Sequence, residues 1–215
     1  MPDGRDAARS DSTESARSSS SETPAGGGTA ADAGGEAAGG ATGGPTEKCG
    51  VVGLSLADRD AARPLYYSLY ALQHRGQESA GIVTHDGFQQ HDHVEMGLVG
   101  DAFDEDDLEA LRGSAGIGHV RYPTAGSVDK SCAQPFTVSF RSGALGLSHN
   151  GNLVNADEVR DELAAEGHAF TSDGDTEVIA HDLARNLLEA DLVRAVKRTM
   201  GRIHGSYSLT IMHDD

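Results

Sequence analysis

The sequence predicts a layered α+β fold in a domain of ordinary size. The segments typical of strands come in groups, and the segments typical of helices follow them, so the two do not alternate one by one. This order favours an α+β architecture over a doubly wound sheet. The glycines at 113–118 lack the strand-to-helix context of a phosphate loop, so we expect no nucleotide-binding fold.

Residues 1–48 cannot build a hydrophobic core. They hold 10 of the 28 glycines and, apart from Met1, no Val, Ile, Leu, Phe, Tyr, Cys, His, Asn or Gln. A segment of this composition stays disordered. We interpret residues 1–48 as a Gly/Ala/Ser-rich tail and a propeptide, and we expect the folded domain to begin at Cys49.

The first part of the domain combines strands with two helices. We expect strands at 49–55, 79–84, 89–96 and 115–122, and helices at 62–72 and 105–111. Leu65, Leu69 and Leu72 recur at helical spacing. The Asp86-Gly87 pair indicates a hairpin turn, and Asp104 is a candidate helix cap.

The second part begins with two strands and continues with helices. We expect strands at 136–140, 144–148 and 206–212, and helices at 155–166, after Asp175, and up to about Met200. Asn155 and Glu158 predict a capping pair, and Gly167 a helix end. The last strand runs almost to the final residue, so we expect the chain to stop inside its domain.

Composition excludes several kinds of partner. The chain has 34 acidic and 17 basic residues, a net charge of −17, and only 4 basic and 8 acidic residues lie in the tail. An acidic domain surface repels nucleic acid and anionic membranes, so neither is expected as a partner. No apolar run approaches the roughly 20 residues that span a bilayer. We therefore expect a soluble, cytoplasmic protein with an acidic surface, suited to a cytoplasm rich in salt.

Cysteine and histidine spacing indicates no metal site. Cys49 and Cys132 are 83 positions apart, without a Cys-x-x-Cys pattern. His91 and His93 share one face of a strand, but no third ligand is near in sequence. We therefore interpret the two histidines as solvated strand residues.

Cys49 is the first residue after the tail and begins the first expected strand. If the tail were removed, its α-amine, with a pKa near 8, could take the proton of the thiol. One residue would then supply both nucleophile and base. The alternative is a small hydrophobic residue in an edge strand.

Three further segments could bind a substrate. In His149-Asn150-Gly151-Asn152, an amide beside a glycine N–H offers two donors to an oxyanion, although Asn-Gly is also the commonest hairpin turn. Arg121 at a strand end suits a carboxylate, or is an ordinary surface residue. Asp175 opens a helix, as a cap or as a partner for a substrate ammonium.

Six motifs occur in order over residues 49–215. They are Cys49-Gly-Val-Val-Gly, Gln73-His-Arg-Gly-Gln-Glu-Ser-Ala-Gly-Ile82, Gly116–Gly126, Ala133-Gln-Pro-Phe136, His149–Asn152 and Asp175-Thr-Glu-Val-Ile179. Together they closely resemble the class II glutamine amidotransferases, which are N-terminal-nucleophile hydrolases. The form His-Arg-Gly-Gln is similar to the amidophosphoribosyltransferase branch, whereas glucosamine-phosphate synthases have Tyr-Arg-Gly-Tyr.

The resemblance implies a fold and a nucleophile. The fold is the N-terminal-nucleophile hydrolase fold, a four-layer αββα arrangement with two stacked antiparallel sheets between helical layers. Cys49 is expected to attack the side-chain amide of glutamine, with its own α-amine as base. Asn150 and Gly151 are expected to stabilise the oxyanion.

The resemblance also implies a glutamine-binding site. Arg121, helped by Thr124, is expected to hold the α-carboxylate. Asp175, with Gly151, is expected to hold the α-ammonium. Arg75 is expected to position the loop around the nucleophile.

The implied reaction needs no metal or other cofactor in this domain. Glutamine is hydrolysed to glutamate and ammonia through a thioester. The ammonia passes to a phosphoribosyltransferase domain absent from this chain, where Mg²⁺ is expected on the pyrophosphate of phosphoribosyl pyrophosphate. The product would be 5-phosphoribosylamine, in the first step of de novo purine (IMP) biosynthesis, and a homo-oligomer is expected for the full-length enzyme.

Some positions depart from the family pattern. Gly174 stands where the family often has Ser, and Asp173 is an alternative to Asp175. We expect Cys132 to be a bystander. The alternative functions are another class II amidotransferase, of the glucosamine-phosphate or asparagine synthetase type, and a non-catalytic protein with Cys49 unprocessed.

Overall fold

The computed structural model describes residues 49–122, 130–141 and 143–214. Within these ranges the strands form two antiparallel sheets, which we call sheet A, with the order β1-β4-β2-β3, and sheet B, with the order β5-β6-β7. The strands are β1 Gly50–Ser55, β2 Ser79–His85, β3 Gln90–Met96, β4 Ala115–Arg121, β5 Phe136–Phe140, β6 Gly143–Leu153 and β7 Gly205–His213.

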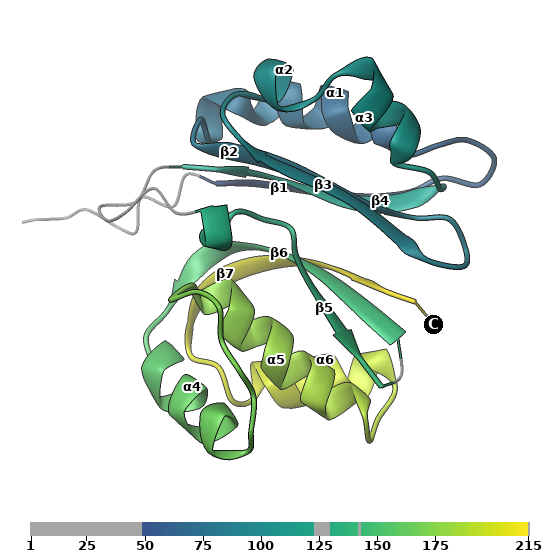
Figure 1. Cartoon of the computed structure of the whole chain (residues 1–215). Coiled ribbons are helices and arrows are strands. Elements are labelled where there is room, and N and C mark those ends of the chain that lie inside the picture. Colours follow the sequence, from purple (N-terminus) through teal and green to yellow (C-terminus); the bar gives the residue numbers. More distant parts are fainter. Residues whose placement is uncertain (1–48, 123–129, 142, 215) are drawn as a thin grey trace, which may run out of the picture. The chain divides into compact units, whose positions relative to one another are not determined.

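Helices α1 (Ala62–Leu72), α2 (Val99–Ala102) and α3 (Glu105–Ala110) cover one face of sheet A (Figure 1). Leu65 and Leu69 of α1 are fully buried there. Gly118 of β4 makes room for α1, because a Cβ on it would lie 3.1 Å from Leu69 Cδ1. The predicted bounds of α1 are confirmed, and so is the Asp104 cap, which forms a reciprocal capping box with Asp107.

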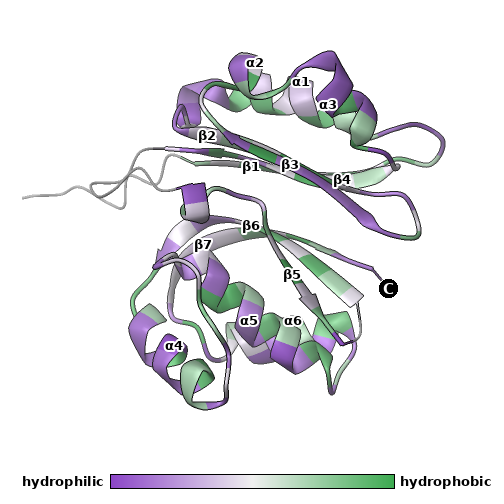
Figure 2. Ribbon diagram, in the orientation of Figure 1, coloured by the Kyte–Doolittle hydropathy of each residue, from purple (hydrophilic) through white to green (hydrophobic). Residues whose placement is uncertain are grey.

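Helices α4 (Ala156–Ala165), α5 (Asp175–Leu187) and α6 (Leu192–Met200) lie next to sheet B, on its side away from sheet A (Figure 1). α5 packs on β5 and β6 through Ile179, Leu183 and Leu187, the spacing expected from the sequence. α4 and α6 pack against α5. Figure 2 shows hydrophobic and hydrophilic residues mixed along α5, as expected for a helix with one buried face.

The two sheets face each other. Val83 of β2, Ile117 of β4 and Met212 of β7 form one buried cluster between them. Gly146 of β6 also lies close to sheet A, because a Cβ on it would be 3.3 Å from Ile117 Cδ1. The order of layers is therefore helix, sheet, sheet, helix, as the family resemblance implied.

Two local predictions are wrong. The strand predicted at 144–148 does not end there, because β6 continues to Leu153 and pairs with β7 along this stretch. This excludes the alternative that Asn150 and Gly151 form a hairpin turn. Helix α4 does begin after Asn155, but the Asn155 side chain makes no cap bond. Instead, it donates to the Arg202 carbonyl and accepts from the His204 N–H, so it ties α4 to the segment before β7.

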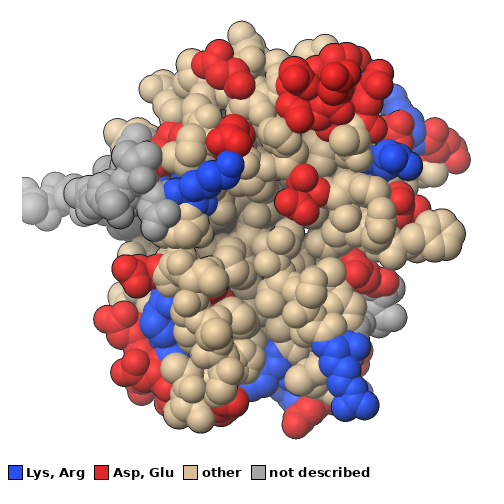
Figure 3. Space-filling model, in the orientation of Figure 1, with Lys and Arg blue, Asp and Glu red and all other residues tan. Residues whose placement is uncertain are grey.

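Within the described ranges, no helix is long and apolar enough to cross a membrane. On the face drawn in Figure 3, carboxylates gather over α3, which has the sequence Glu-Asp-Asp-Leu-Glu-Ala.

Candidate active site

Cys49 lies directly before β1 and is half-buried. Gly50 faces α1, since a Cβ on it would lie 3.1 Å from Leu72 Cβ. Because side chains alternate along a strand, Cys49 lies on the opposite face, which sheet B covers. The backbone N–H of Tyr122, the residue after β4, donates a hydrogen bond to Cys49 Sγ over 3.5 Å. The thiol is thus held at the junction of β1 and β4.

Charges and burial around the thiol act in opposite directions. Burial has the largest effect and raises the pKa of Cys49 above its ordinary value, and the carboxylate of Glu78 adds to this rise. The Tyr122 N–H and the guanidinium groups of Arg121 and Arg75 lower the same pKa. Because the pKa remains raised, the thiol is protonated at neutral pH and needs a base to become a nucleophile.

Arg75 closes the 3-10 turn that follows α1 (Gln73–Arg75) and holds the backbone at the nucleophile. Its Nε donates to the carbonyl oxygen of Cys49 at 3.0 Å. The next residue, Gly76, lies so close to β4 that a Cβ on it would be 2.6 Å from the Val120 carbonyl oxygen. Only glycine permits this approach.

Arg121 is the last residue of β4, and its side chain is only 12% exposed, so the surface-residue interpretation is wrong. Its Nη1 donates to the carboxylate of Glu78, whose side chain is 5% exposed. The Glu78 N–H also donates to the Arg121 carbonyl at 2.9 Å. Glu78 was not predicted as a site residue, although a single acidic residue directly before the small and apolar residues of β2 was an available signal.

Asn150 and Gly151 lie near the end of β6 and pair with Ser208 and Tyr207 of β7. Gly151 has no room for a side chain, because a Cβ would lie 2.3 Å from the Ser206 carbonyl oxygen. Side chains four positions apart lie on the same face of a strand, so Asn150 shares the face of Gly146, which lies close to sheet A. Its buried Oδ1 has no hydrogen-bond partner among the residues that the structure describes.

His149 connects this part of β6 to sheet A. Its carbonyl oxygen accepts a hydrogen bond from His119 Nε2 of β4 at 3.2 Å, and its N–H donates to Gln134 Oε1 at 2.7 Å. Burial lowers the pKa of His119 to about 3 and that of His149 to about 4. Both imidazoles are therefore neutral at pH 7, and the bond from the His119 imidazole to the His149 carbonyl connects β4 to β6 beside Asn150.

Asp175 is the first residue of α5, so the helix-cap interpretation is wrong, and the cap position belongs to Gly174. Its Oδ2 accepts from the Leu153 N–H at 2.7 Å, which fixes the carboxylate against the end of β6. Burial raises the pKa of Asp175, against the effects of this hydrogen bond and of Arg160. Asp173, the alternative carboxylate, is exposed. Of these two carboxylates, Asp175 is therefore the one that the structure fixes against the end of β6.

Two charged side chains hold the loop before α5, and neither was identified from the sequence. The carboxylate of Glu177 accepts hydrogen bonds of 2.7 to 2.9 Å from the N–H and hydroxyl groups of Thr171 and Ser172. Arg160 of α4 donates to the carbonyl oxygens of Ser172 and Gly174 at 2.8 and 3.2 Å. The loop is thus fixed immediately before Asp175.

The predicted site residues fall into two groups. Cys49, Arg75 and Arg121 lie at one end of sheet A, and Asn150, Gly151 and Asp175 lie at the end of β6. The hydrogen bond between His119 and His149 joins the two groups. Thr124 lies outside the described residues. Within those residues, no group of three or more His, Cys, Asp or Glu side chains could hold a metal ion.

A family model described as a glutamine amidotransferase domain matches residues 121–215. This range holds Arg121, Asn150, Gly151 and Asp175. The chain contains a glutamine amidotransferase domain.

Known relatives are similar to this domain in sequence and in structure. An amidophosphoribosyltransferase of Methanocaldococcus jannaschii is 48% identical over 169 residues, which cover 78% of this chain and 36% of that protein. A solved glutamine phosphoribosylpyrophosphate amidotransferase from B. subtilis, in complex with ADP and GMP, is 35% identical with a TM-score of 0.67, over 76% of this chain and 35% of that one. The solved allosteric regulatory enzyme of purine biosynthesis is 38% identical with a TM-score of 0.69, with the same coverage.

These likenesses show the N-terminal-nucleophile hydrolase fold that the resemblance implied. This chain spans about a third of the length of the relatives that it matches.

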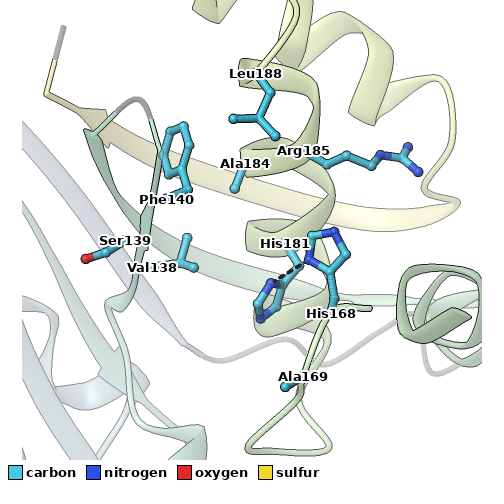
Figure 4. A pocket seen from close by; sticks show the side chains of 9 residues that line it. All are labelled: Val138, Ser139, Phe140, His168, Ala169, His181, Ala184, Arg185 and Leu188. Carbon is cyan, nitrogen blue, oxygen red and sulfur yellow. Dashed lines mark hydrogen bonds between the residues drawn. The ribbon is translucent and has the colours of Figure 1, made fainter. Parts of the chain in front are cut away.

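A cavity of about 280 Å³ lies elsewhere in the glutamine amidotransferase domain (Figure 4). Val138 and Phe140 of β5 line it with His168 and His181, whose Nδ1 atoms are 3.1 Å apart. These residues lie on the face of sheet B that carries α5, opposite the face that covers Cys49. The cavity contains none of the predicted site residues.

Proposed function

We propose that this domain hydrolyses glutamine to glutamate and ammonia through a thioester at Cys49. The arrangement that carries the proposal is the thiol at the start of β1, with the Tyr122 N–H on its sulfur and Arg121 at the end of the adjacent strand. A nucleophile beside a buried arginine suits a substrate with an electrophilic carbonyl and a carboxylate.

The proposed chemistry uses Cys49 twice. The thiol adds to the side-chain amide carbon, and the bond to nitrogen then breaks as ammonia leaves with a proton. Water attacks the γ-glutamyl thioester, releases glutamate and restores the thiol. In this scheme the Asn150 amide and the Gly151 N–H stabilise the oxyanion of each tetrahedral intermediate.

The first proton transfer requires a base beside the thiol. In the chain as encoded, Lys48 precedes Cys49, so the Cys49 nitrogen is an amide and is not basic. Cleavage after Lys48 would create an α-amine with a reference pKa near 8, which can take the thiol proton. Removal of residues 1–48 is therefore part of the proposal.

The proposed substrate site uses one charged group for each end of glutamine. Arg121, with Thr124, binds the α-carboxylate, and Asp175 binds the α-ammonium. The carboxylate of Asp175 is anchored by Leu153, so it is oriented before substrate binds. A preoriented charge loses little conformational freedom on binding.

For the complete protein we propose an amidophosphoribosyltransferase. This is supported by the similarity to proteins of that name, which favours it over the glucosamine-phosphate and asparagine synthetase types. Ammonia would displace pyrophosphate from phosphoribosyl pyrophosphate and give 5-phosphoribosylamine, with Mg²⁺ required in the phosphoribosyltransferase part. A homo-oligomer in the cytoplasm remains our expectation.

The proposal is tested by intact mass measurement and by a glutaminase assay on the same preparation. We expect a chain that begins at Cys49, equal release of glutamate and ammonia, and a transient adduct of one γ-glutamyl group on Cys49. Protein that keeps residues 1–48 and is nevertheless fully active would contradict the proposed base. A processed protein without glutaminase activity would contradict the proposed reaction.

A further inference from the structure

Glu78 is fixed on both sides by backbone hydrogen bonds. Its N–H donates to the Arg121 carbonyl at 2.9 Å, and its own carbonyl accepts from the Gly97 N–H at 2.8 Å. Its carboxylate, 5% exposed, accepts a hydrogen bond from Arg121 Nη1. Glu78 is therefore a rigid, buried partner for Arg121.

This ion pair determines how the guanidinium is oriented. A guanidinium is a planar fork with donors on more than one edge. When Nη1 is bound to a fixed carboxylate, the plane of the fork is set, and so is the direction in which its other edges point. An arginine without this support would have to lose more rotamer freedom when the substrate binds.

The same short segment also holds the nucleophile. Arg75 binds the Cys49 carbonyl, and three residues later Glu78 binds Arg121. Gly76, between them, lies against the backbone of β4. Residues 75–78 therefore set the separation between the thiol and the guanidinium.

We propose that Glu78 is a positioning residue that presents Arg121 to the α-carboxylate of glutamine. This inference rests on the proposed function, because it needs Arg121 to bind that carboxylate. It adds a residue that acts through Arg121 and does not touch the substrate.

The charge of Glu78 has a separate effect on the thiol. It raises the pKa of Cys49, so loss of the charge should lower this pKa and leave the thiol more reactive at neutral pH. Loss of positioning should slow any reaction that depends on the substrate carboxylate. The two effects are opposite in sign. Because unfolding would also expose the thiol, both rates are compared well below the melting temperature of each variant, where the folded protein is what reacts.

The test compares two thiol reagents on the intact protein, with labelling at Cys49 followed by peptide mass spectrometry. The glutamine analogue 6-diazo-5-oxo-L-norleucine carries the α-carboxylate and α-ammonium, whereas iodoacetamide carries neither. In Glu78→Ala we expect labelling by the analogue at subsaturating concentration to slow by about tenfold or more, as for loss of a charge-assisted hydrogen bond. Labelling by iodoacetamide should be unchanged or faster.

Glu78→Gln keeps an acceptor oxygen near Arg121, so its rate with the analogue should lie between those of the wild type and Glu78→Ala. If Glu78→Ala does not fold, Glu78→Gln alone decides the comparison. The matched control is Asp182→Asn, at a fully buried carboxylate that accepts from Arg185 and Arg202 at 2.8 and 2.9 Å. This variant should lower the melting temperature without changing the ratio of the two labelling rates.

Two results would overturn the inference while leaving the proposed function intact. One is an unchanged rate with the glutamine analogue in both Glu78 variants. The other is an equal slowing with both reagents, which would mean that Glu78 acts on the thiol and not on the binding of the substrate carboxylate by Arg121. If wild-type Cys49 reacts with iodoacetamide but not with the analogue, the proposed function itself fails, and this inference fails with it.

Discussion

The Nε atom of Arg75 donates a hydrogen bond to the carbonyl oxygen of Cys49 over 3.0 Å. Arg75 thus binds the main chain of the nucleophile and not its sulfur. It determines where β1 begins and, through this, where the thiol lies relative to Tyr122.

We expect Arg75→Ala to lower kcat/KM for glutamine by about tenfold to a hundredfold, because a hydrogen bond from a charged group contributes about 1.5 to 3 kcal/mol. Arg75→Lys should recover part of this loss, since one ammonium can still donate to one carbonyl oxygen. Steady-state glutamate release measures both values. A change of less than threefold in Arg75→Ala would show that β1 holds Cys49 without this bond.

In a full-length protein with its phosphoribosyltransferase part, we expect Cys49→Ala to abolish glutamine-dependent formation of 5-phosphoribosylamine. Activity with free ammonia should remain, because only the release of ammonia from glutamine uses the thiol. Both activities are measured on one preparation by following pyrophosphate release. Equal loss of both would contradict the assignment of Cys49.

The second cysteine provides a matched control. Cys132 lies beside the loop before α5, since its Sγ would be 3.8 Å from a Cβ on Gly174. We expect Cys132→Ala to leave glutamine hydrolysis within a few-fold of the wild type, because only a contact with the loop is lost. A loss as large as that of Cys49→Ala would mean that the wrong thiol has been assigned.

Local patterns in the sequence were enough to predict most of the elements. The leucines of α1, the Asp86-Gly87 turn and the Asp104 cap each depend on residues a few positions apart. The strand predicted at 144–148 is too short, because at Asn150-Gly151 the local turn propensity is overruled by pairing with Tyr207 and Ser208 of β7. That partner strand lies more than 50 residues away in the sequence, so no local rule could have identified it.

The candidate site shows the same limit. Arg121 and Asp175 could be named as candidates from the sequence because Arg121 stands at the end of a strand and Asp175 at the start of a helix. Glu78 was missed because its role depends on Arg121, 43 positions away. His119 was missed because its partner is a carbonyl oxygen, that of His149, which no side-chain pattern reports.

The buried histidines predict how stability depends on pH. The pKa of His119 is lowered to about 3 in the folded state, whereas an unfolded histidine has a pKa near 6.5. Below pH 6.5 the unfolded chain therefore binds a proton that the folded protein does not, and stability falls until the folded pKa is reached. For one such histidine the loss between pH 7 and pH 5 is about 2 kcal/mol.

We expect His119→Gln to remove this part of the pH dependence, because glutamine does not titrate and its amide can still donate to the His149 carbonyl. Urea unfolding at pH 7, 6 and 5 measures the change in the free energy of unfolding. The wild type should lose about 2 kcal/mol more than the variant over this range. Parallel curves for the two proteins would contradict a neutral, buried His119.

Arg121 offers the most direct test of the proposed substrate site. Loss of the charge-assisted contact between Arg121 and the α-carboxylate of glutamine would leave that carboxylate unpaired. We expect this to cost about 2 to 4 kcal/mol of binding free energy, more if the contact is bidentate. At about 1.4 kcal/mol per factor of ten, Arg121→Ala should lower kcat/KM for glutamine roughly 30- to 1000-fold. Removal of Arg121 also leaves the Glu78 carboxylate unpaired, so this variant should unfold at a lower temperature.

Arg121→Lys separates these two effects. An ammonium can still pair with Glu78 and restore much of the stability, but it cannot present a planar fork to a second carboxylate. We therefore expect Arg121→Lys to recover the melting temperature while kcat/KM for glutamine stays low. Ammonia has no carboxylate, so ammonia-dependent activity of the full-length protein should remain normal in both variants. If KM for glutamine rose less than threefold in Arg121→Ala and kcat stayed unchanged, the α-carboxylate would have to bind elsewhere, and Arg121 would serve only to neutralise Glu78.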